Sequence, residues 1–388
     1  MSRNRFSFLL SLSPMDSIDQ NLRKISRDDY LTIVSIFGSL SGLVQGFLTT
    51  LSGMMLVDNA FLQEMYRHND SKFSDRFIML FYAGEILGSL MSFPFSDIFG
   101  RKTTLIYTSI ICIFAITWNV LTTSGADFLT SRFFVGWALG VLLSTSPVYT
   151  SEIALTAHRG YTIGMLGLTT ITGSLMAGLL FYLLRSYAIG WRVCLTVPVI
   201  VLMIKAGVLL LLPESPRWLL ALHTPAECLE SMRQLRRTND VSREFNDIYL
   251  ALSSDARLGE SWTDILSSKT IRYRLFVCCL MQLSQQMLGI NIITTFGSDF
   301  LQLINVHSIL LGLSLAYIAA LLGTFLGLAH IDIWGRRFIL IFGCCSMGIS
   351  WIGAATCVYV GESFLLCSAL LCSVVLLCVT DVLHCTIL

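Results

Sequence analysis

Apolar stretches about as long as a bilayer is thick recur along this chain, and they limit its fold more than any other feature. A transmembrane helix needs about 20 predominantly apolar residues, and ten stretches meet that length. Charged residues make up only 13% of the chain, whereas a soluble domain carries about a quarter. The sequence therefore predicts an all-α, polytopic transmembrane protein. Its helices are expected near residues 31–57, 76–96, 103–122, 127–149, 161–184, 191–212, 274–298, 308–331, 338–358 and 363–380.

A polar stretch, residues 213–273, separates the sixth apolar stretch from the seventh and shows helix-like periodicity. It divides the transmembrane part into two groups of different size. We predict four regions: a tail over residues 1–30, an N-terminal six-helix bundle over 31–212, a helical linker over 213–273 and a partial C-terminal bundle of about four helices over 274–388.

The lysine and arginine residues predict the orientation in the membrane. Most of the 26 lie in the tail, the linker and the loops that share one side with the N-terminus. Short loops rich in these residues stay in the cytosol. The sequon Asn69-Asp70-Ser71 falls on the opposite side, which agrees with this assignment. We expect an integral protein of the plasma membrane with its N-terminus, tail and linker in the cytosol.

Signals for enzymatic chemistry are missing from the sequence. None of the 12 cysteines pairs with a histidine at the spacing of metal ligands, and most lie inside apolar stretches as small buried side chains. No nucleophile–base pair or phosphate-binding loop stands out. The net charge of +1 does not favour nucleic acid. We expect no enzyme activity, no cofactor, no metal and no nucleic-acid partner.

A charged motif occurs twice between apolar stretches. Asp97-Ile98-Phe99-Gly100-Arg101-Lys102 returns as Asp332-Ile333-Trp334-Gly335-Arg336-Arg337. Such a repeat indicates two related halves. Ordinary positive-inside anchors would explain the cations, but not the aspartate or the glycine. Glycine permits a tight turn with positive φ, and an aspartate near a helix end can pair with an arginine of a neighbouring helix.

These motifs resemble the loop motifs of the major facilitator superfamily, and three further stretches are similar to its sugar-porter branch. The resemblance follows the family's order over residues 31–340 and implies the major-facilitator fold, with two helical bundles that alternately open to either side of the membrane. The three stretches are Arg132-X-X-X-Gly136 leading to Pro147-Val148-Tyr149-Thr150-Ser151-Glu152 and Arg159-Gly160, then Pro213-Glu214-Ser215-Pro216-Arg217-Trp218-Leu219, then Gln285-Gln286-Met287-Leu288-Gly289-Ile290-Asn291.

The resemblance implies a cytosolic gate. In that family, acidic and arginine side chains form ion pairs between helices, which hold the outward-facing state closed at the inside. Single surface ion pairs are weak, but several between two moving bundles can bias a two-state equilibrium by a few kcal/mol. The matching gate residues are Asp97, Arg101, Glu152, Arg159, Glu214, Arg217, Asp332 and Arg336.

The seventh apolar stretch carries the candidate sugar site. Gln282, Gln285, Gln286 and Gly289 follow the spacing of one helix face, and amides match the paired donor and acceptor of sugar hydroxyls. Polar contacts between helices are the alternative reading of these amides. The resemblance implies sugar contacts for Gln285, Gln286 and Asn291, with a helix break near Gly289.

Arg132 and Glu85 are unusual charges inside predicted membrane helices, and Leu40 bears on the first of them. Leu40 occupies the position of the family's proton-coupling aspartate, so we expect no proton coupling by that route. The same substitution removes the partner that the family would supply to Arg132, and a lone arginine in the membrane is costly. We expect Glu85, in the second apolar stretch, to compensate Arg132.

The resemblance also has departures. Gly167 and Ala320 stand where the family has sugar-contacting amides, and the second half has four apolar stretches where the family has six. The cavity would be open on one flank unless a partner chain covers it. We expect a hexose-type sugar transporter in the lipid bilayer that works by facilitated diffusion. The alternative is a truncated, non-transporting membrane protein such as a sensor, an assembly subunit or a degenerate gene product.

Overall fold

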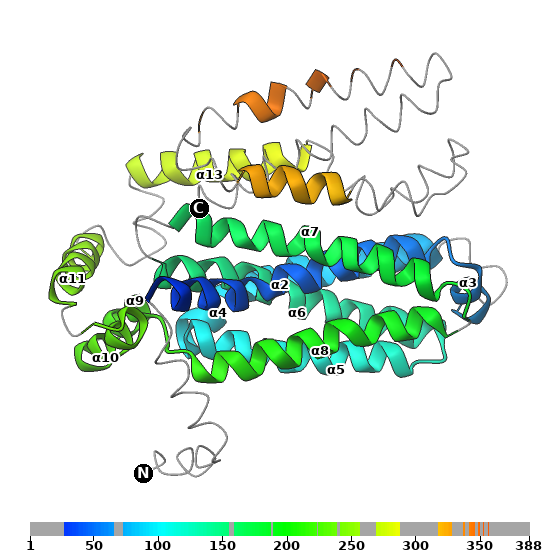
Figure 1. Cartoon of the computed structure of the whole chain (residues 1–388), viewed down its shortest axis with the longest axis horizontal. Coiled ribbons are helices and arrows are strands. Elements are labelled where there is room, and N and C mark those ends of the chain that lie inside the picture. Colours follow the sequence, from blue (N-terminus) through cyan, green and yellow to red (C-terminus); the bar gives the residue numbers. More distant parts are fainter. Residues whose placement is uncertain are drawn as a thin grey trace, which may run out of the picture.

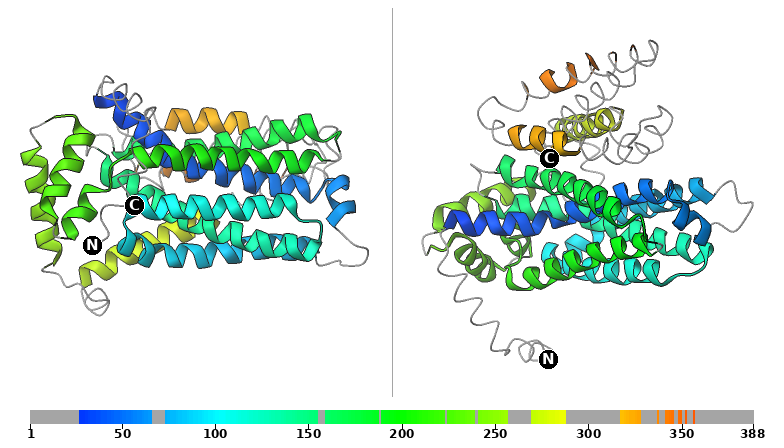
Figure 2. Two further views of the ribbon diagram at one scale, coloured as in Figure 1. Left: turned by 90° about the horizontal axis from the view of Figure 1, so that it is seen from below. Right: turned by 45° about the vertical axis from the view of Figure 1, so that its right-hand side comes forward.

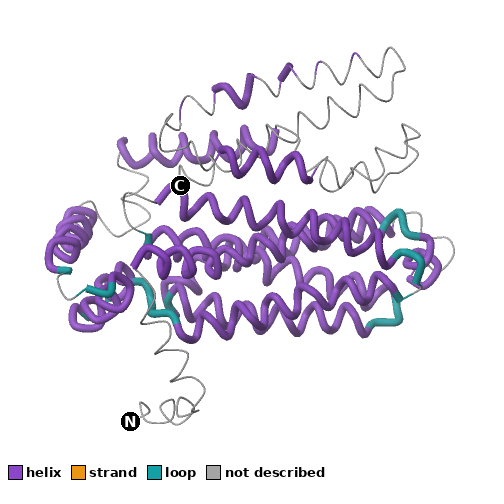
Figure 3. The backbone as a smooth tube through the Cα atoms, viewed as in Figure 1, coloured by secondary structure: helices purple, strands orange, loops and turns teal. Residues whose placement is uncertain are grey.

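Every regular element in the described part of the chain is a helix, as the sequence predicts (Figure 3). The structure is a computed structural model. It describes residues 27–65, 73–154, 159–187, 189–222, 224–238, 241–256, 269–287 and 317–327, with short pieces between 337 and 356.

Six of the described helices are long and apolar enough to cross a membrane, and they lie side by side along one direction (Figure 1). The predicted N-terminal six-helix bundle is therefore confirmed. These helices are α2 (Arg27–Met55), α4 (Phe73–Phe99), α5 (Arg101–Leu121), α6 (Gly125–Ile153), α7 (Arg159–Leu184) and α8 (Gly190–Leu211). The expected helix over 127–149 extends to Ile153. Backbone hydrogen bonds do not require apolar side chains, so a helix can continue through polar residues after its apolar run has ended.

Short helices lie at the two ends of the bundle (Figures 1 and 2). The helix α3 (Asn59–Met65) follows α2 at one end. The helices α9 (Pro216–Ala221), α10 (Pro225–Arg236) and α11 (Ser242–Ala256) lie at the opposite end. We call this second end the α9–α11 end. A small apolar cluster that includes Leu220, Cys228 and Met232 packs these three helices together.

The second half of the chain is described only in part. The helix α13 (Lys269–Met287) and an apolar helix over Tyr317–Gly327 lie on the α7 side of the bundle (Figure 1). Thr50 of α2 donates a hydrogen bond to the Tyr317 hydroxyl at 3.2 Å, so the second half meets the first through α2. The expected stretch 363–380 and most of 338–358 lie outside the described residues.

Glycines set the tightest helix pairs of the bundle, which are α2 with α7 and α4 with α6. A Cβ atom at Gly46 of α2 would overlap the backbone carbonyl of Thr170 on α7. A Cβ atom at Gly140 of α6 would overlap the carbonyl of Glu85 on α4. Small residues at such contacts are the usual means of close helix packing in membranes. These glycines therefore bring α2 against α7, and α4 against α6, at backbone contact.

Buried aromatic rings close the end of the bundle at which α3 lies. The ring of Phe61 on α3 lies 5.2 Å from Trp191 on α8 and 5.3 Å from Phe128 on α6. Beside them, Glu64 and Arg192 form an ion pair at 2.5 Å. This end therefore combines ring packing with one ion pair, whereas the α9–α11 end combines the apolar cluster with a larger set of charged contacts.

Candidate functional site: a charged network at one end of the bundle

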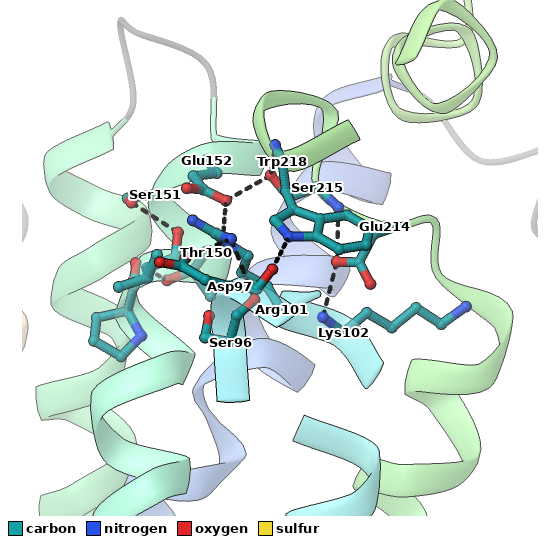
Figure 4. A network of polar contacts seen from close by, with 12 residues as sticks. Ser96, Asp97, Arg101, Lys102, Thr150, Ser151, Glu152, Glu214, Ser215 and Trp218 are labelled. Atoms are coloured by element: carbon teal, nitrogen blue, oxygen red, sulfur yellow. Dashed lines mark hydrogen bonds and ion pairs between the residues drawn. The ribbon is translucent and has the colours of Figure 1, made fainter. Parts of the chain in front are cut away.

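Arg101 is the centre of a charged network at the α9–α11 end (Figure 4). Its Nη1 lies 3.1 Å from Oδ1 of Asp97 on α4, and its Nε lies 3.2 Å from Oε2 of Glu152 on α6. The Nε–H is not aligned with the Glu152 oxygen, so this contact is an ion pair rather than a well-formed hydrogen bond. Because Arg101 begins α5, its guanidinium joins the ends of three consecutive membrane helices.

The contact between Arg101 and Glu152 is more protected from solvent than the contact with Asp97. The side chains of Arg101 and Glu152 are 16% and 10% exposed, whereas that of Asp97 is 47% exposed. Exposed ion pairs contribute little because water screens them. Removing one partner of a desolvated pair leaves an uncompensated charge and costs far more. Glu152 is therefore the partner of Arg101 on which the network depends.

Glu214 links the segment after α8 to the beginning of α5. Its Oε1 accepts hydrogen bonds from the backbone N–H of Lys102 at 2.9 Å and of Ser215 at 3.0 Å. The first N–H groups of a helix lack partners within the helix, and the positive end of the helix dipole favours a carboxylate there. Ser215 also donates through its hydroxyl to Glu152 Oε2 at 2.5 Å. The two glutamates therefore belong to one network.

Gly100 is required at the turn between α4 and α5 for two reasons. Its φ is 91°, which side chains other than glycine rarely adopt. A Cβ atom there would also lie 2.7 Å from Glu214 Oε2 and 3.2 Å from the Trp218 ring. Trp218 in turn donates from Nε1 to the carbonyl of Asp97 at 2.9 Å. The tight turn predicted from the motif is present, and α9 packs directly over it.

Four of the eight predicted gate residues come together in this network: Asp97, Arg101, Glu152 and Glu214. Arg217 is exposed on α9 and forms no ion pair with any described residue. The side chain of Arg159 and both Asp332 and Arg336 lie outside the described residues. All described contacts of the network lie within the N-terminal bundle and the beginning of the linker, so they hold these two parts together at the α9–α11 end.

Arg236 is a further member of this end that the sequence analysis missed. Its Nη1 donates to the carbonyl of Ile153, the last residue of α6, at 2.8 Å. Its Nε and Nη2 donate to the two carboxylate oxygens of Glu244 on α11, at 2.8 and 2.5 Å. An arginine suits the unpaired carbonyls at a helix end. The only sign of it in the sequence is the position of this arginine within the helical periodicity of the linker, which puts it on the face of α10 that is buried in the structure.

The predicted sugar-contacting residues lie on or just beyond α13. Gln282 is half-buried and Gln286 is exposed on this helix. The side chain of Gln285, as well as Gly289 and Asn291, lies outside the described residues. The sugar site and the helix break therefore stay predictions.

Glu85 and Arg132 do not contact each other directly in the described part of the chain, so the compensation of Arg132 by Glu85 stays a prediction. Arg132 is 1% exposed, its Nη2 donates to the Ser52 hydroxyl, and its Cζ lies 4.4 Å from the ring centre of Phe77 and 4.7 Å from that of Phe81. Glu85 instead accepts a hydrogen bond from Gln45 Nε2 at 2.9 Å. The close packing of α4 on α6 sets Arg132 against Phe77 and Phe81, one to two helical turns along α4 from Glu85. Aromatic faces stabilise a desolvated guanidinium.

Lys205 of α8 is a second buried cation, and the sequence analysis did not single it out. Its side chain is fully buried near Cys112 of α5, and its Nζ has no hydrogen-bond partner among the described residues. The only sign of it in the sequence is a single lysine inside the sixth apolar stretch. The orientation of the chain was predicted from lysines and arginines in loops, so a lysine inside a helix did not enter that prediction.

Comparison with known proteins places this arrangement among transporters. The family model described as "Sugar (and other) transporter" matches residues 32–383. Sugar transport protein 4 of Arabidopsis thaliana is 27% identical over 82% of this chain and 66% of its own length. Major facilitator-type transporter ecdD of Aspergillus rugulosus is 28% identical over 82% of this chain and 62% of its own. Probable inositol transporter 3 of Arabidopsis thaliana is 25% identical over 85% of this chain. The chain thus spans about 60% of the length of these relatives, between 58% and 66%.

Solved structures share the fold. The proton:xylose symporter XylE bound to 6-bromo-6-deoxy-D-glucose superposes with a TM-score of 0.84 at 18% identity, over 93% of this chain and 82% of that one. The inward-open conformation of XylE from E. coli superposes with a TM-score of 0.70 at 17% identity, over 90% and 80% of the two chains. The predicted major-facilitator fold is confirmed.

Replacing Gly100 by alanine tests the turn on which the network is built. Gly100→Ala should lower the melting temperature of the purified protein, because a backbone with φ of 91° and ψ of 162° costs about 1–3 kcal/mol for a residue with a Cβ and the methyl group would displace Glu214. Gly207→Ala is the matched control, since a Cβ there meets nothing within 4 Å. Equal melting temperatures for the two variants would contradict this account of the turn.

Proposed function

Because the chain belongs to the Sugar (and other) transporter family, we propose that it carries a hexose-type sugar across a membrane by alternating access. Members of that family are transporters, not enzymes, and the six long apolar helices make the chain an integral membrane protein. The match over residues 32–383 is the observation that carries the proposal, since it includes the bundle, the charged network and the glutamines of α13.

The substrate class is proposed from chemistry that the relatives share. Their names refer to sugars and to inositol, which are rings that carry several hydroxyl groups. Carboxamides both donate to and accept from hydroxyl groups. Gln282, Gln285, Gln286 and Asn291 are the proposed substrate contacts in the second half.

The charged network is proposed as the first half's share of a cytosolic gate. Alternating access moves one bundle against the other, which requires each bundle to move as a unit. Arg101, Glu152 and Glu214 supply that cohesion by joining α4, α5, α6 and α9. Contacts from Arg159, Arg217, Asp332 and Arg336 would then hold the two halves together at this end. We place the protein in the plasma membrane, with the α9–α11 end and the N-terminus in the cytosol. This orientation follows from the distribution of lysine and arginine residues.

Purified protein in liposomes should exchange labelled for unlabelled glucose. Gln282→Ala and Gln286→Ala should each slow the exchange about tenfold, which corresponds to about 1.4 kcal/mol and to the loss of a hydrogen bond to substrate. Ser284→Ala is the control on the same helix, because the Ser284 hydroxyl donates to the carbonyl of Leu280. Folded protein that exchanges no hexose would overturn the proposed function.

Transport should be independent of a proton gradient. Leu40, half-buried on α2, has no group that takes up a proton at the position where the resemblance would place an aspartate. An acidic exterior should therefore leave the final sugar distribution across the liposome membrane unchanged. The sugar should still equilibrate between the two sides. Accumulation of sugar above the external concentration, driven by the gradient, would contradict facilitated diffusion.

A further inference from the structure

Tyr317, a residue of the second half, is buried against the first half. It begins the apolar helix Tyr317–Gly327 and is only 4% exposed. Its ring belongs to the main apolar core cluster, whose other described members lie between Val34 and Leu235. A tyrosine ring buries a large apolar area, so withdrawing it from such a cluster costs free energy. Tyr317 therefore joins the two halves through the core of the first.

The helix Tyr317–Gly327 turns one face toward neighbouring protein. Ala320 and Thr324 are buried like Tyr317, and the three residues follow the spacing of one helix face. Ile318 and Leu322, on the other side of the helix, are exposed. The burial of Tyr317 is thus a property of a whole helix face that docks against other helices.

A hydrogen bond fixes the Tyr317 hydroxyl to α2. Its donor is Thr50, which is also buried, at 3.2 Å. One helical turn before Thr50, Gly46 lies at backbone contact with α7, and Ser174 of α7 donates to the Gly46 carbonyl at 3.1 Å. Thr50 is therefore held by a closely packed helix pair, so Tyr317 meets a rigid part of the first half.

The contact lies toward the α3 end of the bundle. Thr50 is about one and a half helical turns before Met55, the last residue of α2, and α3 follows from there (Figure 1). The charged network around Arg101 lies at the opposite end. In a transporter whose two halves rock against each other, a contact between the halves near one end closes the path to that side.

We propose that Thr50 and Tyr317 form a latch between the two halves, which closes the sugar path at the α3 end and opens to admit substrate from that side. This inference rests on the alternating access proposed above. A single hydrogen bond between neutral groups shifts an equilibrium by about fivefold. Such a latch holds the path closed without locking it, which suits a contact that must open in every transport cycle. The predicted orientation makes this side the outside.

Ala320 offers a reporter position for the latch, because it is buried on the same helix face one turn after Tyr317. In Ala320→Cys, a hydrophilic maleimide should react slowly with the purified protein in lipid nanodiscs. The reaction should become faster when the latch opens more often. Peptide mass spectrometry measures the label at residue 320 separately from the label on native cysteines, and the measurement does not require transport.

Two conservative variants in this reporter protein test the hydrogen bond. Thr50→Val and Tyr317→Phe should each raise the labelling rate about fivefold, which corresponds to about 1 kcal/mol. The double variant should react no faster than either single variant, because both remove the same bond. Thr172→Val and Tyr149→Phe are the matched controls. Their hydroxyls donate within α7 and at the α9–α11 end, respectively, so their labelling should stay at the rate of the reporter protein.

A cross-link tests whether the latch must open during transport. Thr50→Cys combined with Tyr317→Cys, joined by a short cleavable bis-methanethiosulfonate, should lose nearly all glucose exchange in liposomes and regain it after reduction. The two single-cysteine variants treated in the same way are the controls. If the wild type exchanges no hexose, the proposed function fails, whereas the labelling rates still decide the latch.

Three results would overturn the latch. The first is labelling at the reporter protein's own rate in either Thr50→Val or Tyr317→Phe. The second is a double variant that reacts faster than each single variant. The third is undiminished glucose exchange by the cross-linked protein.

Discussion

The guanidinium of Arg101 lies where α4 and α6 end and α5 begins. It contacts the carboxylate of Asp97 on α4 and that of Glu152 on α6. Its position follows from the turn at Gly100, which reverses the chain with a positive φ and leaves no space for a side chain. Glu214, in the segment after α8, then accepts a hydrogen bond from the backbone N–H of Lys102 in the first turn of α5. One arginine, one glycine and one glutamate thus fix the relative positions of segments that lie far apart in the sequence.

The opposite end of the bundle is held differently. There, aromatic rings around Phe61 pack together, and Arg192 lies over the Trp191 ring, donates to the carbonyls of Val120 and Thr122 at the end of α5, and forms a partly exposed ion pair with Glu64. A bundle that must move as a unit needs both ends fixed. In the proposed mechanism, the charged end also faces charged partners in the second half. Charge is suited to that task because ion pairs between two halves can form and separate without exposing apolar surface.

The sequence predicted the features that depend on local pattern. Apolar length placed six membrane helices, and the spacing of Asp97, Gly100 and Arg101 predicted the turn and its ion pair. Features that depend on helix rotation and depth were not predicted. Arg132 binds Ser52 and two phenyl rings rather than Glu85 because close packing of α4 on α6 sets their relative depth. Lys205 and Arg236 were missed because burial of a long cationic side chain depends on its neighbours, which a single sequence does not reveal.

The central claim is that the protected pair of Arg101 with Glu152 lets the first half act as a unit during transport. The most direct test compares the rates of glucose exchange for Glu152→Gln and Glu64→Gln in liposomes, at equal amounts of folded protein. Both variants remove the carboxylate partner of an arginine, at opposite ends of the bundle. We expect Glu152→Gln to slow exchange about tenfold, equivalent to about 1.4 kcal/mol, and Glu64→Gln to leave the rate nearly unchanged. Equal rates for the two variants would contradict the claim.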